Sequence, residues 1–309
     1  MSVSVVIAAH TLDRWDDIVA GIEGVRAQTR PPLETILVID HNPELRERAT
    51  AHFPDVRVVD NPRGRGCSGA RNTGVAHARG DVVAFLDDDA FPEPDWLEEL
   101  IGAFDAPEVV VVGGRAVPVW PRERPQHLPP ELDWLVGCTY LGQPTVRTDV
   151  RNPFGCNMAM RRALFAEVGG FDEDAGRKGQ VPLGGEETQF CIRVAQQRPE
   201  ARVVLEPQAV VHHRVSQDRT EFAYLVSRSK AEGISKAAIA RTVGGSDATS
   251  EEGAYLRRVL PRALRRELAR ALKGDRAGWR GACGIVTCAL TTAAWYARSR
   301  VRAPRLGDR

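Results

Sequence analysis

The sequence predicts an α/β fold in which a doubly wound, mostly parallel sheet is flanked by helices and followed by a helical C-terminal extension. Two observations support this prediction. Short apolar runs rich in β-branched residues alternate with segments of helical periodicity over residues 3–104, which is the pattern of a doubly wound sheet. Beyond Thr220 the pattern becomes mainly helical. We therefore expect an α/β domain over residues 1–220 and a helical extension over residues 221–309.

The elements can be placed one by one along the chain. Strands of a parallel sheet are covered on both faces, so they read as nearly continuous apolar runs. Such runs predict strands at residues 3–9, 34–39, 56–59, 82–86 and 109–112. Helical periodicity predicts helices at residues 13–28, 44–52, 68–78 and 95–104, the last with Asp95 as its N-cap. The rest of the domain predicts a proline-rich loop at 118–130, helices at 164–168 and 186–197, and two short strands at 203–205 and 209–211.

The composition excludes several classes of protein. The chain has 309 residues, a net charge of +1, 43% hydrophobic and 27% charged residues, which is ordinary for a globular protein. Nothing in this balance favours a nucleic-acid partner. The six cysteines show neither C-x-x-C nor zinc-finger spacing, and residues 1–7 read as a strand and not as a secretion signal. These features predict a cytoplasmic protein with reduced cysteines.

Acidic residues follow two of the predicted strands. Asp40 ends the second strand, and Asp87, Asp88 and Asp89 come directly after the fourth. Ligands of doubly wound sheets bind at the carboxyl ends of the strands, and adjacent carboxylates that repel one another are stabilised by a divalent cation. An acidic surface turn or a helix cap is the plainer interpretation, but Asp95 already caps the next helix. The absence of G-x-G-x-x-G and of a P-loop sequence argues against dinucleotide and P-loop enzymes.

Several blocks, taken in order, resemble family 2 glycosyltransferases with the GT-A fold. Each block is short, but together they run from residue 3 to about residue 215 in the order of the family. The blocks are V-S-V-V-I-A-A through Asp40, N-P and S-G-A-R-N-T-G within 61–74, G-D and F-L-D-D-D within 80–89, G-C-N-M at 155–158, V-G-G-F-D-E at 168–173, G-E-E-T at 185–188 and C-I-R at 191–193. The resemblance implies a glycosyltransferase that uses a UDP-, GDP- or dTDP-linked sugar, with a nucleotide-sugar half at about residues 1–115 and an acceptor half at about 116–220.

The resemblance also implies which residues bind the donor. Asp40 matches the aspartate that contacts the nucleoside, Arg71 and Asn72 match a pair beside the nucleotide, and Asp88 would lie near the ribose. Ala8 and His10 belong to the same expected nucleotide-sugar site. Two plainer alternatives remain open at this point: a strand-terminating turn for Asp40 and a structural ion pair for Arg71.

A divalent metal, Mg²⁺ or Mn²⁺, is implied by the same family pattern. Asp87 and Asp89 match the acidic positions of its D-x-D motif, and Asp89 would bind the metal directly. A histidine late in the domain would complete the site. The sequence offers His212 and His213, and we choose His213, with a packing histidine as the alternative.

The expected catalytic pair is Glu186 and Glu187. Family members usually carry Glu-Asp here, and the second carboxylate is the base that accepts the acceptor's proton, so Glu187 is the matching residue. Glutamate is one methylene longer, which is a departure from the pattern. Both residues begin a predicted helix, whose dipole favours ionised carboxylates; their plainer role is that of ordinary first-turn residues.

Motifs that are absent or present bear on the mode of transfer and argue against two rival functions. The Q-x-x-R-W motif of processive synthases is absent, which favours transfer of a single sugar. The resemblance implies that the transfer is inverting and that the acceptor is a hydroxyl of a glycan, a lipid-linked or a small-molecule acceptor, among which the sequence does not choose. A nucleotidyltransferase that makes a nucleotide sugar shares the core, but it would carry a glycine-rich basic loop after the first strand, where this chain has A-A-H-T-L. A non-catalytic sugar-binding relative would have lost the acidic residues that are present here.

The C-terminal segment contains an uncharged run at residues 281–297, flanked by arginines and by Trp279, Trp295 and Tyr296. The run is short and only mildly apolar for a membrane span. Its flanks suit a helix resting on an anionic membrane surface. A helix packed on the α/β domain or on a second copy in a homodimer is an equal alternative.

Overall fold

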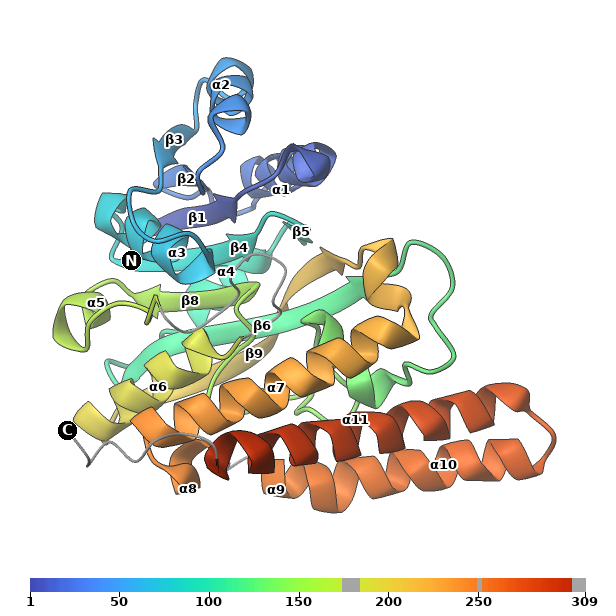
Figure 1. The fold of residues 1–309 in the computed structure, drawn as a ribbon. Helices are drawn as coiled ribbons and strands as arrows, with labels where there is room; N and C mark the ends of the chain where they lie inside the picture. Colours follow the sequence, from blue (N-terminus) through green and yellow to red (C-terminus); the bar gives the residue numbers. More distant parts are fainter. Residues whose placement is uncertain (174–183, 249–251, 302–309) are drawn as a thin grey trace.

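One sheet runs through the centre of the protein, with helices on both faces (Figure 1). The computed structural model describes residues 1–173, 184–248 and 252–301. Among these residues nine strands pair in the order β3-β2-β1-β4-β8-β6-β9-β5, and β7 pairs with β9. The strands are β1 (Val3–Ala9), β2 (Glu34–Ile39), β3 (Arg57–Asp60), β4 (Val82–Asp87), β5 (Ala90–Pro92), β6 (Val109–Val119), β7 (Thr148–Asp149), β8 (Asn157–Arg161) and β9 (Arg202–Arg214).

The first half of the sheet is parallel, as the sequence predicts. Strand β1 pairs in parallel with β2 and β4, and β2 with β3. Strand β8 is antiparallel to both β4 and β6, and β6 is parallel to β9. Strands β1 to β4, β6 and β9 therefore point the same way, and the sheet is mostly parallel. The predicted α/β fold class is confirmed.

The two faces of the sheet are buried under different helices. Alternate side chains of a strand point to opposite faces, so Val5 and Ile7 pack into one core cluster and Val6 into another. The first cluster includes helices α1 (Trp15–Arg26), α2 (Pro43–His52) and α4 (Trp96–Gly102), and the second includes α3 (Cys67–His77), α5 (Leu164–Glu167) and α6 (Glu186–Gln197). Burial on both faces explains the continuous apolar runs of these strands.

The second half of the sheet departs from the predicted strands. Strand β6 is longer than the run predicted at 109–112, and β9 is one strand where two were predicted at 203–205 and 209–211. Strands β6 and β9 stay paired along their length because the register shifts between Gly113 and Arg115. A bulge there takes up the extra residues of β9. The short strands β5 and β8 were not predicted. Strand β5 pairs with the end of β9, with Ala90 opposite His213.

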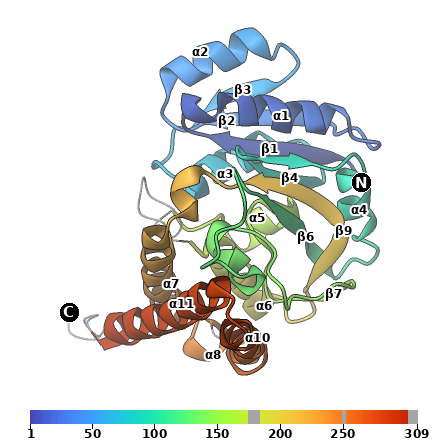
Figure 2. The ribbon, with the colours of Figure 1, turned by 90° about the vertical axis from the view of Figure 1, so that its right-hand side faces the viewer.

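The C-terminal helices cross below the sheet (Figures 1 and 2). They are α7 (Phe222–Thr242), α8 (Gly245–Ala248), α9 (Glu252–Ala254), the π-helical turn η4 (Tyr255–Val259), α10 (Leu260–Leu272) and α11 (Arg276–Val301). We call them together the hairpin, because the two long helices α10 and α11 fold back on each other. Helix α11 packs on α7 and α10. Gly233 lets α7 approach α11 closely, since a Cβ there would lie 2.5 Å from the Thr292 carbonyl oxygen. Residues 302–309 of the predicted extension lie outside the described residues.

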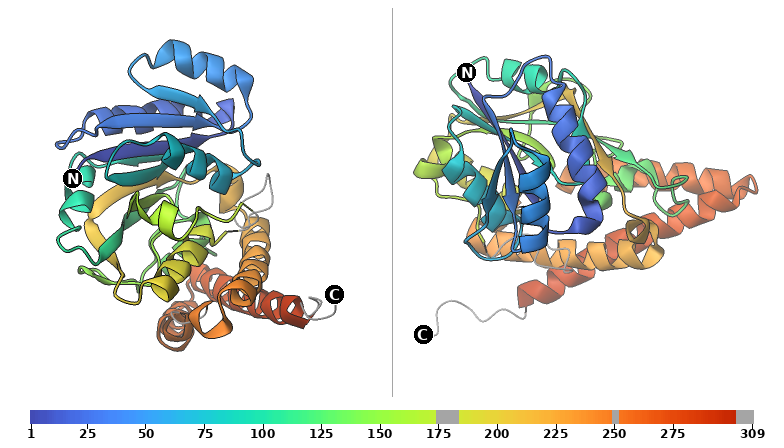
Figure 3. Two further views of the ribbon diagram at one scale, coloured as in Figure 1. Left: turned by 90° about the vertical axis from the view of Figure 1, so that its left-hand side faces the viewer. Right: turned by 90° about the horizontal axis from the view of Figure 1, so that it is seen from above.

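The hairpin shares a core with the α/β part of the chain. The 3₁₀ segment η2 (Pro130–Val136) contributes Leu132 and Leu135 to a cluster that also contains Leu225 of α7 and Ile285 of α11. The far end of the hairpin projects beyond the rest of the molecule (Figure 3, right). The division of the chain at residue 220 stays a prediction.

Candidate active site

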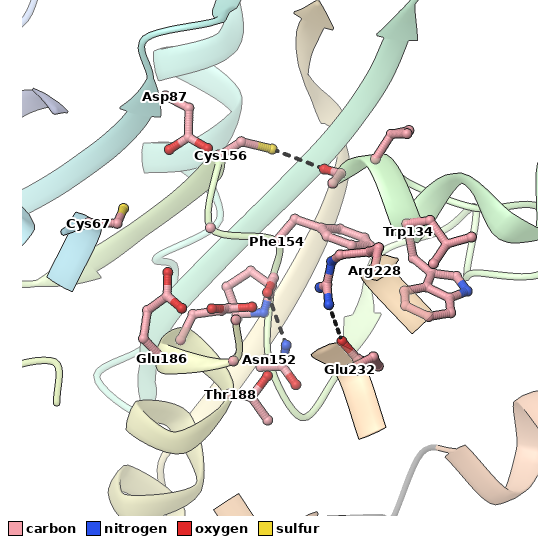
Figure 4. A pocket seen from close by; sticks show the side chains of 18 of the residues that line it. Cys67, Asp87, Trp134, Asn152, Phe154, Cys156, Glu186, Thr188, Arg228 and Glu232 are labelled. Atoms are coloured by element: carbon pink, nitrogen blue, oxygen red, sulfur yellow. Dashed lines mark hydrogen bonds and ion pairs between the residues drawn. The ribbon is translucent and has the colours of Figure 1, made fainter. Parts of the chain in front are cut away.

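A cavity of about 930 Å³ opens at the carboxyl ends of β1, β2 and β4. One side of its wall comes from these strand ends and from the start of α6, and the other from α7, η4 and α11. Figure 4 shows Asp87 and Glu186 on the first side and Trp134, Arg228 and Glu232 on the second. Residues from both halves of the α/β part and from the helical hairpin therefore face one space.

Arg71 connects two of the predicted acidic positions. From α3 its guanidinium donates to Asp87 Oδ1 at 2.8 Å, to Glu186 Oε1 at 2.9 Å and to the Gly155 carbonyl at 3.0 Å. Arg71 is buried. Gly155 permits this approach, because a Cβ there would lie 2.9 Å from Arg71 Nη2. The structural ion pair considered for Arg71 is therefore present, and Arg71 also lines the cavity.

Asp88 and Asp89 are buried beyond the end of β4, and the guanidinium of Arg14 lies close to both. Arg14, which ends the 3₁₀ segment η1 (Leu12–Arg14), pairs with Asp88 Oδ1 and lies 3.1 Å from Asp89 Oδ2. Arg219 lies 3.6 Å from Asp89 Oδ2. Burial acts to raise the pKa of Asp89, but His213 and these two arginines outweigh it and hold that pKa well below its usual range. Asp89 is thus an ionised, buried carboxylate.

His213 is the histidine that faces the acidic loop. Its Nε2 lies 3.1 Å from Asp89 Oδ1. His212, one residue earlier on β9, points to the other face of the strand, where it contacts Glu93 Oε1 at 2.5 Å and stacks on Phe91. Strand alternation therefore separates two residues that the sequence alone left almost equivalent.

Asp87, Asp89 and His213 fit a divalent cation. One ligand atom from each lies within 4.8 Å of the other two. Asp88 Oδ2 is buried and makes no hydrogen bond within the described part of the chain, and buried Asp89 Oδ1 has His213 Nε2 as its close neighbour. Buried carboxylate oxygens without hydrogen-bond donors are costly unless a cation neutralises them. Two carboxylates and an imidazole form a donor set that suits Mn²⁺ and, with added water, Mg²⁺.

The other predicted donor-site residues divide into two groups. Ala8, His10 and Asp40 line the cavity, and Asp40 also holds the neighbouring loops by accepting from Asn61 Nδ2 at 2.7 Å and from the Gly66 amide at 2.9 Å. Asn72, by contrast, is not among the residues that line the described cavity.

Asn72 is committed to a backbone contact. Its side chain donates to the Phe171 carbonyl and accepts from the Phe171 amide, both at 2.8 Å. Successive side chains on a helix point about 100° apart, so when Arg71 faces the cavity Asn72 faces the loop at Phe171. The contact of Asn72 with the nucleotide stays a prediction, and the structure gives it a visible role in fixing that loop.

Glu186 and Glu187 begin α6 after Gly185, whose φ of 96° lies in the left-handed region. Glu186 is held by Arg71, whereas no cation lies within ion-pair distance of Glu187 among the residues that the structure describes. Burial, followed by the charge of Glu186, raises the pKa of Glu187 to about 8. The helix dipole led us to expect an ionised carboxylate; burial overrides the dipole, so Glu187 is largely protonated at neutral pH before ligands bind.

Several cavity residues have no sequence motif to reveal them. Arg14, Arg219 and the α7 residues Arg228, Glu232 and Lys236 all line the cavity. Charged residues at helical spacing usually indicate a solvated face. The only signal in the sequence is the i, i+4 spacing of the three α7 residues.

No described helix is long and apolar enough to cross a membrane.

Comparison with known proteins identifies the family. The sequence profile described as "Glycosyl transferase family 2" matches residues 4–169. The chain is 39% identical over 264 residues to a glucosyl-dolichyl phosphate glucuronosyltransferase of Haloferax volcanii, covering 84% of this chain and 83% of that protein. It is 33% identical over 190 residues to a pre-mycofactocin glycosyltransferase of Mycobacterium tuberculosis, covering 60% of this chain and 37% of that protein.

Solved structures show the same fold. A mannosyltransferase of Pyrobaculum calidifontis in complex with GDP-Man and Mn²⁺ superposes with a TM-score of 0.59 at 18% identity, covering 96% of this chain and 86% of that one. GalNAc-T7 with UDP, GalNAc and Mn²⁺ gives a TM-score of 0.54 at 17% identity, covering 76% and 48%. With a family match over more than half of its length and a relative of 39% identity aligned over most of both chains, the chain belongs to glycosyl transferase family 2 and is a glycosyltransferase with the GT-A fold.

Proposed function

We propose that this glycosyltransferase moves a single sugar, with inversion, from a nucleotide diphosphate sugar to a hydroxyl of a lipid-linked acceptor. The observation that carries the proposal is the shared cavity. Asp87, Asp89 and His213 gather at one end of a space that Glu187 also lines. A leaving diphosphate and an acceptor hydroxyl need these two kinds of group on the two sides of the reacting carbon.

The donor side depends on a divalent metal in this proposal. Asp87, Asp89 and His213 would hold Mg²⁺ or Mn²⁺, and the metal would supply Lewis-acid stabilisation of the charge on the departing diphosphate. Both similar structures contain Mn²⁺. Asp40 accepts hydrogen bonds from the nucleoside, Ala8 and His10 line its position, and Asp88 lies toward the ribose.

Arg71 positions two acidic residues of the cavity wall through ion pairs. It holds Glu186 at 2.9 Å in a buried ion pair and Asp87 at 2.8 Å in a partly buried one. Removal of one partner of a buried ion pair leaves an uncompensated charge. Arg71 therefore sets the relative positions of the metal-side carboxylate and the helix start that carries the base.

Glu187 is the general base of the proposed reaction. A base accepts the hydroxyl proton best when its pKa is near the working pH, and burial has raised the pKa of Glu187 to about 8. Glu186 keeps that pKa high through its charge but is itself held by Arg71. The proton therefore goes to a Glu187 oxygen as the oxygen–carbon bond forms on the face opposite the leaving group.

The acceptor class rests on the Haloferax volcanii relative, whose name specifies a glucosyl-dolichyl phosphate. The cavity here is suited to such a molecule, because the hairpin adds apolar side chains to its wall, among them Leu256, Leu260 and Ala289. Nucleotidyltransferase activity and a non-catalytic role, the two alternatives from the sequence, lack any comparable support.

We further propose that the outer face of α11 rests on an anionic membrane surface. Apolar or small side chains are exposed there at i, i+3 and i+4 spacing: Trp279, Cys283, Val286, Leu290, Ala294, Ala297 and Val301. Exposed arginines lie beside this α11 stripe: Arg276, Arg280, Arg298 and Arg300. An exposed apolar stripe with basic flanks matches the charge and polarity of an anionic bilayer surface.

A screen of nucleotide sugars tests the function. The full chain is incubated with UDP-, GDP- and dTDP-sugars, a short-chain prenyl-phosphate-linked glucose, and Mg²⁺, Mn²⁺ or excess chelator. We expect metal-dependent transfer of one sugar and, from an α-linked donor, a β-linked product. Retained configuration or longer chains in the product would contradict the inverting or the single-transfer part, and full activity in chelator would contradict the metal.

A further inference from the structure

A group of charged side chains lies on the side of the cavity that the family motifs do not reach. It consists of Arg151, which follows β7, Arg228, Glu232 and Lys236 of α7, and Glu252 of α9, and we call it the α7 charge cluster. Lys236 pairs with Glu232 at 3.0 Å and with Glu252, and Arg151 forms a two-pronged pair with Glu252 at 2.9 and 3.0 Å. All five residues line the cavity.

The balance of charge in this cluster favours an anionic ligand. It contains three cations and two carboxylates, which leaves one positive charge without a counter-charge inside the cluster. Burial raises the pKa of Glu187, which weakens the negative charge that this residue adds. Charges in a partly buried cavity are screened less than charges on an open surface, so the excess acts on whatever enters the space.

Arg228 is the cation best placed to meet that ligand. Nη1 donates to Glu232 Oε2 at 2.9 Å, and this is its one hydrogen bond among the described residues. A guanidinium has five N–H donors in a planar fork, so Nε and Nη2 remain available. The side chain is half-buried, and Cζ lies 5.9 Å from the centre of the Trp134 ring. Figure 4 shows the guanidinium beside Phe154 and above Glu232.

Arg228 also lies close to the start of α6. A Cβ added to Gly184 would lie 3.4 Å from Arg228 Nη2, so the guanidinium reaches the turn that leads into Glu186 and Glu187. Burial acts to lower the pKa of Arg228, and Glu232 and, more weakly, Glu187 raise it above its usual value. Glu187 therefore lies between the Arg71 ion pairs and the α7 charge cluster.

Beyond the cluster the cavity wall becomes apolar. Helices α10 and α11 and the turn η4 contribute the side chains Leu256, Leu260, Ala289, Ala293 and Tyr296. The same helix α11 carries the exposed stripe on its outer face. A ligand that lies along this wall thus has a charged group near Glu187 and an apolar part against the hairpin.

We propose that Arg228, supported by Lys236, binds the phosphate of the lipid-linked acceptor, and that the apolar wall of η4, α10 and α11 receives the first part of its hydrocarbon chain. This inference rests on the proposed function and specifies where its acceptor binds. A planar guanidinium matches two phosphate oxygens at once, and such charge-assisted pairs are stronger than neutral hydrogen bonds. The phosphate would fix the attached sugar so that its hydroxyl meets Glu187.

Direct binding of a ten-carbon prenyl phosphate tests the site without any need for turnover. Affinity is measured by calorimetry for the full chain and for Arg228→Gln, Arg228→Lys and Arg241→Gln. Arg241 is the matched control, because it is an exposed arginine of the same helix outside the described cavity. We expect Arg228→Gln to weaken binding about tenfold or more, Arg228→Lys to retain part of the affinity, and Arg241→Gln to change nothing.

Further probes separate the sources of the anion. Inorganic phosphate and the uncharged prenyl alcohol should each bind more weakly than the prenyl phosphate. Equal loss of affinity in Arg228→Gln and Arg241→Gln would overturn the proposal, as would inorganic phosphate binding as tightly as the lipid. If Arg228→Gln weakens binding of a UDP-uronate but not of the prenyl phosphate, the anion belongs to the donor sugar and the proposal is wrong. Equal melting temperatures of the variants exclude misfolding as the cause.

Failure of the proposed function gives a different result. If Arg228-dependent binding of the prenyl phosphate persists while no nucleotide sugar yields metal-dependent transfer, the lipid site stands and the reaction is wrong. If sugar transfer to neutral glycosides is active while prenyl phosphate does not bind, the reaction stands and the lipid site is wrong.

Discussion

The two sides of the cavity are built by different means. The strand-end side carries Asp87 and His213 within the last residues of β4 and β9, and Asp40 and Asp89 just beyond the ends of β2 and β4. The pairing of these strands fixes their positions. The hairpin side carries its charges along α7 and its apolar groups on η4, α10 and α11. Strand ends can be located from apolar runs, and the family shares their motifs. The hairpin side depends on how helices pack, and a single sequence does not show this.

This contrast suggests a division of labour. Chemistry shared by a family belongs on the rigid strand ends, where loops project from a fixed sheet. In the proposed function, the acceptor is selected by the hairpin helices. Glu187 lies where the two sides meet. Substitutions on the strand-end side should therefore reduce turnover with every acceptor. Substitutions on the hairpin side should change the affinity for the acceptor or the binding to a membrane.

The largest effect on the rate of sugar transfer is expected at Glu187, where the two sides of the cavity meet. Glu187→Gln keeps the size of the side chain and removes its basicity, so the rate of transfer should fall about 10² to 10⁴-fold, while donor affinity changes little. Steady-state kinetics and donor titration measure the two quantities. Glu186→Gln is the control and should be milder. Near-normal transfer by Glu187→Gln with an inactive Glu186→Gln would reverse the roles.

Arg71→Met should be the most damaging change to the stability of the strand-end side. It leaves Asp87 and Glu186 without their shared cation, and breaking a buried ion pair costs about 3–5 kcal/mol. Arg63→Met is the control, because Arg63 pairs with Glu173 in an exposed position, where a pair contributes about 0–1 kcal/mol. Chemical denaturation of both variants gives the free energies of unfolding. Equal losses would show that Arg71 is not the structural centre of this side.

Asp89→Asn tests the metal. The change retains the shape but removes the charge of a ligand, and we expect a loss of turnover on the order of 10²-fold, about 2.7 kcal/mol of transition-state stabilisation. Isothermal titration with Mn²⁺ should show weaker metal binding in the same variant. Asp95→Asn, at the start of α4 and outside the described cavity, is the control. Unchanged metal affinity in Asp89→Asn would remove Asp89 from the metal site.

The pH dependence of kcat/KM sharpens the assignment of the base. Glu187 has its pKa raised to about 8 by burial and by Glu186, and only the deprotonated form accepts a proton, so kcat/KM should rise with pH up to about pH 8. In Glu186→Gln the neighbouring negative charge is gone, so the rise should move to lower pH. The raised pKa also means that Glu187 favours folding below about pH 4.5 and loses this contribution as pH rises toward 8. A profile that is flat from pH 5 to 9 would contradict the raised pKa.

The smallest expected effect is on the hairpin's outer face. Leu290 is exposed in the α11 stripe, and Leu290→Asp should reduce binding to anionic vesicles severalfold in a sedimentation assay at low salt without lowering transfer to a short-chain acceptor in solution. Leu33→Asp, at an exposed leucine far from the hairpin, controls for added charge. If the intact chain does not bind vesicles but forms dimers that Leu290→Asp dissociates, the α11 stripe is an interface between two copies of the chain.

The sequence predicted the strand-end side well and the hairpin side poorly, for physical reasons. Continuous apolar runs identify buried parallel strands, so the positions of Asp40 and Asp87 at strand ends followed directly. The antiparallel strand β8 was missed because five residues carry too little periodicity, and its insertion decides how β6 and β9 lie in the sheet. Resemblance supplied the expected roles of Arg71 and Asn72, but helix geometry turns only Arg71 toward the cavity.

By itself the sequence determined the α/β fold class, the family and the acidic residues at the strand ends, because these depend on local periodicity and on short motifs. Only the tertiary structure decided the rest. Strand alternation turned His213 and not His212 toward the acidic loop. Burial outweighed the helix dipole and raised the pKa of Glu187, and the packing of α7 against α11 brought Arg228 to the cavity. Each of these depends on which distant segments meet, and this is settled by the packing of the whole chain.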